Sequence, residues 1–324
     1  MGHNATEQLE YESPSIIETP VIIDIVNVLV FIVSVFGIFL NMTTIIALSH
    51  LPWSSRPNLR LILSLCVANL AFLLNFLIYM ITYYSNPAES GYAATCLMFE
   101  ILRCVIYLYI FFNLSYIVLD LYLAVTNPLG YASIVNKGRT NKLLVMNAVI
   151  CLIIAALAIT FNYITIKDST RVYTHESSCS IYPNYLYIRS FNWIFKVSVF
   201  ICIPVFIVLL LIILLAVKAT NDSSNRNTQP SNLRDVINVY MVMTSFLLCF
   251  GPYQFISFYI QYLPEKYEHY TILAPLLERL FYLNGFFMPL IYSLRMEDVK
   301  KGYTLMFKKC VSAASDYQSV LYRD

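Results

Sequence analysis

The chain has 324 residues, of which 59% are hydrophobic and only 12% are charged, against roughly 45–50% and ~25% in ordinary soluble domains. A soluble fold of this size could not cover so much apolar surface. The same composition excludes a disordered chain, a collagen and a small disulfide scaffold. The formal net charge of +2 is too small to indicate a nucleic-acid partner. We therefore predict an integral membrane protein surrounded by lipid.

Seven segments are long and apolar enough to cross about 30 Å of hydrocarbon, which takes about 20 helical residues. Five of them contain no charged residue, and they are 25–47, 61–84, 143–166, 197–217 and 236–264. Two more carry charge within the apolar run, and they are 96–125 and 271–294. An interrupted segment could instead be re-entrant, but we predict an all-α membrane protein with seven spanning helices. The predicted parts are a tail over 1–20, the membrane domain over 21–294 and a final part over 295–324.

The distribution of Lys and Arg predicts the orientation of these segments. The first 20 residues contain neither, whereas the first, third and fifth connections and the final part contain most of them. Because cytoplasmic loops carry the excess of Lys and Arg, the N-terminus should be extracellular and the C-terminus cytoplasmic. Asn4 begins an N-glycosylation sequon, Asn4-Ala5-Thr6, which then lies on the outer side. We predict a multi-pass protein of the plasma membrane.

Eight cysteines are present, and most lie within apolar segments as small buried hydrophobes. Cys96 and Cys179 alone would face the oxidising side, where a disulfide between them would fix the longest outer loop across the bundle. Cys310 follows a basic amphipathic stretch, and both palmitoylation and a plain free thiol remain open for it. No Cys and His spacing indicates a metal, and no cofactor is predicted.

Five short motifs follow one another along these segments, and their order and positions within the segments form a recognisable pattern. They are GIFLN (37–41), LSLCVANL (63–70), DLYLAVTNPL (120–129), CFGPY (249–253) and MPLIY (288–292). Any one proline would indicate only a helix kink. Together, and over nearly the whole chain, they resemble the rhodopsin-like (class A) G-protein-coupled receptors, whose motifs read L-x-x-A-D-L, D-R-Y-L-A-I-x-x-P-L, C-W-x-P-Y and N-P-x-x-Y.

This resemblance implies a receptor that binds an extracellular small molecule and signals to a heterotrimeric G protein. It also implies a short amphipathic helix 8 from about Met296 to Lys309. Residues 289–300 and 123–131 are similar to olfactory receptors, which favours a divergent chemoreceptor branch, although the C-W-x-P-Y-like motif is untypical of that branch. The positions that match the family's coupling and switch residues are Asp120, Leu121, Tyr122, Phe250, Pro252, Pro289 and Tyr292.

Several family positions differ here in a consistent way. Leu121 stands where the family has the Arg of D-R-Y, and Asn232 stands where an acidic partner is common. Asn69 replaces the sodium-site Asp, and Met288 replaces the Asn of N-P-x-x-Y. Once the arginine is absent, its partners lose their electrostatic role. The receptor could couple through other contacts, or signal weakly or differently; we favour retained but atypical coupling.

Ionisable side chains inside a span are costly, so each is a candidate functional residue. The candidate ligand-binding residues are Glu100, Arg103, Tyr107, Lys196, Tyr253, Glu278, Arg279 and Tyr282. Arg103 and Glu278 could simply form an interhelical salt bridge, or cationic groups could receive an anionic ligand such as an organic acid. By resemblance, Arg103 excludes an amine ligand, for which receptors carry Asp, and Tyr282 excludes retinal, for which opsins carry Lys.

Two other classes of membrane protein compete with the receptor hypothesis. A transporter or channel would show repeats, broken helices and polar residues through the midplane, whereas the charges here gather near the outer third. An intramembrane enzyme would need a catalytic pair or metal motif within the spans. All four histidines lie in predicted loops or ends, so we predict no enzymatic activity.

Overall fold

The computed structural model describes residues 21–51, 57–85, 92–127, 129–168, 207–208, 211–215, 218, 230–262 and 273–321. Every regular element within these residues is a helix. The bounds are α1 (Val21–Ser49), α2 (Pro57–Ser85), α3 (Tyr92–Thr126), α4 (Tyr131–Ile134), α5 (Lys137–Asp168), α7 (Pro230–Tyr262), α8 (Leu273–Arg295) and α9 (Glu297–Leu321).

Six of the seven predicted spanning segments correspond to long helices, namely α1, α2, α3, α5, α7 and α8. The predicted segment 197–217 lies mostly outside the described residues. Within the described part of the chain, five helices are long and apolar enough to cross a membrane, and these are α1, α2, α3, α5 and α7. The shorter α8 contains Glu278 and Arg279, whose charges lower its hydropathy.

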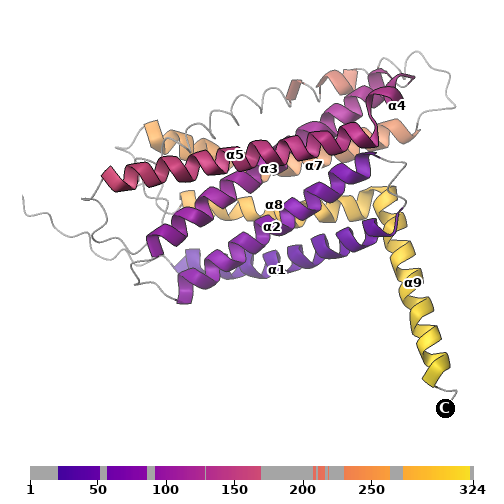
Figure 1. The fold of residues 1–324 in the computed structure, drawn as a ribbon, viewed down its shortest axis with the longest axis horizontal. Helices are drawn as coiled ribbons and strands as arrows, with labels where there is room; N and C mark the ends of the chain where they lie inside the picture. The colour runs from indigo at the N-terminus through magenta and orange to yellow at the C-terminus, as the bar shows by residue number, and fades with distance from the viewer. Residues whose placement is uncertain are drawn as a thin grey trace, which may run out of the picture.

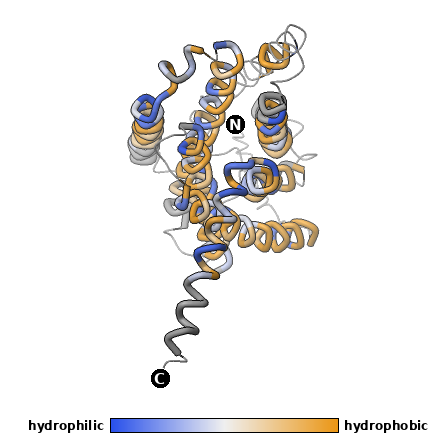
Figure 2. The backbone as a smooth tube through the Cα atoms, turned by 90° about the vertical axis from the view of Figure 1, so that its right-hand side faces the viewer, coloured by the Kyte–Doolittle hydropathy of each residue, from blue (hydrophilic) through white to orange (hydrophobic). Residues whose placement is uncertain are grey.

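The long helices lie side by side as one bundle, and α4 and α9 lie at the same end of it (Figure 1). We call this the α9 end, and the other the opposite end. Helix α8 packs against α1, α2 and α7, and α3 packs against α2, α5 and α7. Figure 2 views the bundle nearly along the helices and shows long hydrophobic stretches, with hydrophilic residues at the nearer helix ends. The helices α2, α3 and α8 each pack against several others, so side chains from several elements converge between them.

The helix faces divide between an aromatic interior and an apolar exterior. Phe72, Phe76 and Phe246 are fully buried. The outward face of α1 exposes large apolar side chains such as Val28, Phe36 and Phe39. Exposed apolar surface on this scale would be unusual in a soluble monomer, whereas lipid is an apolar surrounding that accommodates it.

Glycines and one asparagine allow α1, α2 and α8 to approach closely. The side-chain amide of Asn41 donates to the carbonyl oxygens of Gly37 at 2.7 Å and Gly285 at 2.9 Å, which ties α1 to α8. A Cβ at either Gly37 or Gly285 would lie 2.8 Å from the Leu73 side chain of α2. The buried amide thus satisfies two carbonyls at a contact that larger residues would prevent.

Helix α9 leaves the bundle at an angle (Figure 1) and is fixed to it near its start. The Tyr303 hydroxyl lies 2.8 Å from Thr44 Oγ1 of α1 and 3.1 Å from Ser293 Oγ of α8. The sequence predicted this helix to end near Lys309, but it continues to Leu321. Residues 303–321 contain neither Gly nor Pro, so no residue interrupts the helix.

We expect Gly302→Ala to loosen the attachment of α9 to α1. A Cβ at Gly302 would lie 2.7 Å from the backbone carbonyl oxygen of Ala47, and a backbone atom cannot move aside as a side chain can. Overpacking of this kind destabilises by about 1–3 kcal/mol. Gly251→Ala is the matched control, because a Cβ there meets nothing within 4 Å. Thermal unfolding of the two purified variants measures the difference, and equal unfolding temperatures would contradict the expected clash.

Candidate functional site

A buried ionic cluster lies in the part of the bundle away from α9. Arg103 of α3 forms a salt bridge with Glu278 of α8, and both side chains are 7% exposed. The other Glu278 oxygen, Oε2, lies 3.1 Å from Nη1 of Arg279. Arg103 also donates to the Tyr282 hydroxyl at 3.2 Å. One carboxylate therefore serves two guanidinium groups in an interior where unpaired charge is costly.

Two guanidinium groups lie beside one carboxylate among the described side chains of this cluster. The side chain of Glu100, which precedes Arg103 on α3, is not described. The predicted salt bridge between Arg103 and Glu278 is present, and the second guanidinium group of Arg279 adds to the cationic character that the sequence indicated.

The first helix contributes to this cluster through Asn27. Its side-chain oxygen Oδ1 accepts a hydrogen bond from Nε of Arg279 at 2.6 Å. Its Nδ2 lies 3.5 Å from the Tyr84 hydroxyl of α2. Asn27 is 5% exposed. The sequence does not predict this residue, because a neutral amide within an apolar run gives no signal of its own.

An aromatic cluster packs beneath the charges. The Tyr107 ring of α3 stacks on Phe250 of α7 at a centroid distance of 4.0 Å and on Phe281 of α8 at 4.4 Å. Phe76 stacks on Tyr282 at 4.0 Å. Tyr107 shares a face of α3 with Arg103 by spacing, yet the structure places its ring within this core. The cluster joins the ionic groups to α7, since Tyr282 belongs to both.

Deeper in the bundle, a methionine sulfur accepts from two amides. Nδ2 of Asn69 lies 3.5 Å from Met288 Sδ, and Nδ2 of Asn284 lies 3.7 Å from it. All three residues are buried. A thioether is a weak and uncharged acceptor. The centre that the family resemblance associates with a carboxylate is therefore neutral here.

At the α9 end, Asp120 is engaged by a helix that follows α3. The Tyr131 hydroxyl of α4 donates to Oδ1 of Asp120 at 2.7 Å. Burial, followed by the nearby Asp120 charge and the hydrogen bond, raises the pKa of Tyr131, so the phenol keeps its proton and remains a donor. Leu121 and Tyr122 are half-buried and pack against the core.

Helix α7 is connected to the start of α9 at this end. Arg234 of α7 forms an exposed ion pair with Glu297 of α9. Nearby, Asn238 Nδ2 lies 3.5 Å from the Arg295 carbonyl oxygen. Tyr292 is fully buried, and α7 and α8 continue through Pro252 and Pro289. At this end of the bundle, α7 thus forms an ion pair with α9. Leu121 of α3 is uncharged and cannot form an ion pair with α7.

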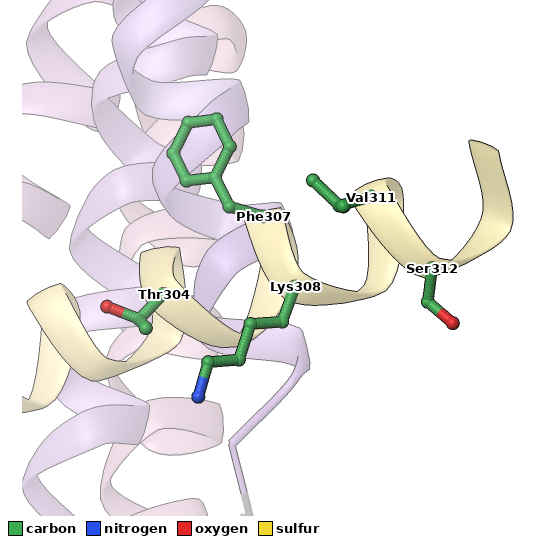
Figure 3. A pocket seen from close by; sticks show the side chains of 5 residues that line it. All are labelled: Thr304, Phe307, Lys308, Val311 and Ser312. Carbon is green, nitrogen blue, oxygen red and sulfur yellow. The ribbon is translucent and has the colours of Figure 1, made fainter. Parts of the chain in front are cut away.

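The part of α9 that extends away from the bundle exposes both apolar and basic side chains. Thr304, Phe307, Lys308, Val311 and Ser312 line a shallow hollow on this helix alone (Figure 3). Phe307 and Val311 point to one side, and Lys308 points to the other (Figure 3). Phe307 is 62% exposed and Val311 is 69% exposed. Apolar and basic groups on opposite faces are typical of a helix at a membrane surface. Cys310 is an exposed free thiol on this helix.

The predicted site residues separate into groups in the structure. Arg103, Glu278, Arg279 and Tyr282 meet in the ionic cluster, and Tyr253 is buried with its ring centroid 6.1 Å from that of Phe281. Glu100 and Cys96 lie on α3, and nothing is described of their side chains. The remaining predicted positions, Asn4, Cys179 and Lys196, lie outside the described residues. Within the described part of the chain, no group of His, Cys, Asp and Glu could hold a metal ion.

Comparison with known proteins identifies the family. The model of the 7 transmembrane receptor (rhodopsin family) matches residues 40–292, which is most of the chain. No individual curated protein matches. The matched region contains Arg103, Glu278, Arg279 and Tyr282 of the ionic cluster, the aromatic cluster and the neutral centre at Met288, whereas Asn27 of α1 precedes it. The described helices α1, α2, α3, α5, α7 and α8, followed by α9, fit a seven-helix bundle with its helix 8, and the chain belongs to the rhodopsin family of seven-transmembrane receptors.

Proposed function

We propose that this signalling receptor responds to an anionic small molecule, such as an organic acid, which binds at the buried ionic cluster. The observation that carries this proposal is the single Glu278 carboxylate shared by Arg103 and Arg279. Two guanidinium groups converge there, which favours the binding of an anion beside them. Guanidinium groups suit this task, since their planar forks match carboxylate geometry. The likeness of residues 289–300 to olfactory receptors supports a chemoreceptor role.

The ligand side of the proposed receptor is extracellular. The cluster lies away from α9, on which Lys300, Lys301, Lys308 and Lys309 are exposed. Basic residues next to a span mark its cytoplasmic side, so the cluster would face the outer half of the membrane. The proposed partners are therefore an extracellular ligand at one end and a heterotrimeric G protein at the other.

Competition for Arg103 links ligand binding to helix movement in this proposal. A ligand carboxylate that pairs with Arg103 would release Glu278 of α8 and weaken the bond between α3 and α8. A ligand changes a conformational equilibrium only through such a difference in its contacts. Tyr282 and Phe281 follow Glu278 on α8, and the Phe281 ring lies 5.1 Å from Phe250. A shift of α8 would thus reach α7 through the aromatic cluster.

A ligand screen in transfected cells tests this proposal. Organic acids and their neutral amide isosteres are applied to cells that express the wild type, Arg103→Gln or Lys309→Gln, and G-protein activation is recorded. We expect responses to acids only, a large loss of potency in Arg103→Gln and no change for the exposed Lys309→Gln. Activation by an amide isostere, or unchanged acid potency in Arg103→Gln, would contradict an anion site at Arg103.

We further propose that coupling is retained but uses contacts other than the family's arginine. Leu121 cannot form an ion pair with α7, and Asp120 is instead bound by Tyr131. The ion pair between Arg234 and Glu297 connects α7 to α9. In this proposal the ion pair with α9 holds α7 in its resting position. α7 must then separate from α9 to open the surface that binds the G protein.

We expect Glu297→Gln to raise basal signalling modestly. An exposed ion pair stabilises by about 0.2–1 kcal/mol, and such a change shifts a two-state equilibrium by at most about fivefold. Nucleotide exchange on a panel of purified G proteins measures the basal rate. The charge exchange Arg234→Glu with Glu297→Arg is the control, because it rebuilds the pair and should restore the wild-type rate. An unchanged rate in Glu297→Gln, or a failure of the exchange to restore it, would count against the connection.

A further inference from the structure

Helix α9 is attached to the bundle by a series of hydroxyl groups centred on Tyr303. The Thr44 hydroxyl donates its one proton to the Leu40 carbonyl oxygen at 2.7 Å. Thr44 can therefore only accept from Tyr303, whose phenol lies 2.8 Å away and must be the donor in this contact. Thr43 of the same helix lies farther from the phenol, at 3.5 Å. The phenol oxygen then accepts from Ser293 Oγ at 3.1 Å. Hydrogen bonds thus run in series from α8 through Tyr303 of α9 to α1.

The start of α9 lies between this anchor and α7. The main packing of α9 is against α1 and α8, and Val299 near its start is fully buried. Helix α7 instead meets α9 at the exposed ion pair between Arg234 and Glu297. Glu297 and Tyr303 are six residues apart, which is about 1.7 helical turns, so their side chains leave different sides of α9. The helix is therefore placed to connect α7 with α1 and α8.

We propose that Tyr303 is a positioning residue: by anchoring α9 to α1 and α8, it allows the ion pair between Arg234 and Glu297 to restrain α7. An ion pair with a fixed helix resists the departure of α7, whereas an ion pair with a free helix would let α9 move along with α7. The effect of the ion pair on signalling therefore depends on the anchor. The part of this inference that concerns α7 rests on the proposed function, whereas the anchoring of α9 does not.

Two substitutions remove the anchor and leave the shape of each residue nearly unchanged. Tyr303→Phe removes both the donated and the accepted hydrogen bond, and Thr44→Val removes the acceptor on α1. Thr304→Val is the matched control, because this exposed neighbour also loses a hydroxyl, but one that donates within α9 to the Lys300 carbonyl oxygen at 3.0 Å. We expect the two anchor variants to behave alike and the control to behave as the wild type.

The mobility of α9 is the first measurement. Cys310 is an exposed free thiol farther along this helix. A nitroxide label attached to it, in purified full-length receptor in lipid nanodiscs, reports the mobility by electron paramagnetic resonance, and labelled Cys310→Ser protein gives the background from other thiols. We expect a more mobile label in Tyr303→Phe and Thr44→Val than in the wild type and Thr304→Val. Equal mobility in all four proteins would overturn the anchor.

The basal rate of nucleotide exchange on G proteins is the second measurement, made on Tyr303→Phe, Glu297→Gln and the double variant. We expect Tyr303→Phe to raise this rate by at most about fivefold, the limit for an exposed ion pair, because the ion pair is still present but no longer restrains α7. The double variant should be no faster than the faster single variant. A general loss of stability would not depend on Glu297 in this way.

The two measurements can fail separately. If Glu297→Gln raises the basal rate and Tyr303→Phe does not, or if their effects multiply in the double variant, the proposed coupling stands and the inference about Tyr303 is wrong. If Tyr303→Phe frees the label but neither single variant changes the basal rate, the anchor stands, and the restraint on α7 is refuted together with the proposed coupling.

Discussion

Replacing Glu278 by glutamine is expected to destabilise the receptor by roughly 3–5 kcal/mol, the usual cost of leaving a buried charge without its partner. Glu278 is 5% exposed, and its carboxylate contacts two guanidinium groups. Glutamine has nearly the same shape, so the change removes charge and leaves the packing intact. Both guanidinium groups would then lose the carboxylate that they share.

Arg103→Gln is the informative comparison, because it removes the other end of the same salt bridge. Glu278 still has Arg279 at 3.1 Å in this variant. Both single substitutions break the salt bridge between Arg103 and Glu278, but only Glu278→Gln also removes the carboxylate from Arg279. We therefore expect Arg103→Gln to be clearly the milder of the two, and the double variant to be more stable than Glu278→Gln alone.

The measurement is the thermal unfolding temperature of the purified proteins, followed by a dye that reacts with buried cysteines as they become exposed. The exposed Glu297→Gln controls for the loss of a carboxylate on the same chain. Equal losses for Glu278→Gln and Arg103→Gln would mean that the salt bridge alone stabilises this region. An additive double variant would lead to the same conclusion, because groups that share a charge network are not independent.

The sequence predicted the helices well because a membrane allows few structures, and an uncharged run of about 20 residues has one common outcome. It also found Arg103 and Glu278, since an ionisable residue within a span is conspicuous. It did not find Asn27, because a neutral amide at one position of an apolar run forms no pattern. Its contact with Arg279, 252 residues away in the chain, depends on how α1 packs against α8.

The limits of spacing arguments appear at Tyr107 and at the end of α9. Tyr107 follows Arg103 by one helical turn, which predicts a shared face, but the depth at which a face changes from polar to aromatic depends on Phe250 and Phe281 of other helices. The family resemblance predicts an end of α9 near Lys309, although no stop signal follows there in the sequence, and the helix continues to Leu321.

The second large effect is expected at Phe250, whose substitution by alanine should destabilise the receptor by roughly 3–5 kcal/mol. Phe250 is 1% exposed. Its ring centroid lies 4.0 Å from that of Tyr107, 5.1 Å from that of Phe281 and 5.6 Å from that of Phe246. Its loss would leave a cavity at the point where α3, α7 and α8 meet. Phe255→Ala is the matched control, since Phe255 lies on the same helix and is 62% exposed.

Phe250→Leu separates packing from transmission between the helices. Leucine fills most of the space and should recover much of the unfolding temperature, but it cannot stack on Tyr107. If the aromatic cluster relays the state of α8 to α7, a fluorophore attached near Arg234 should report an altered resting position of α7 in Phe250→Leu and a wild-type position in Phe255→Ala. An unfolding temperature for Phe250→Ala as high as that for Phe255→Ala would show that this cluster does not hold the three helices together.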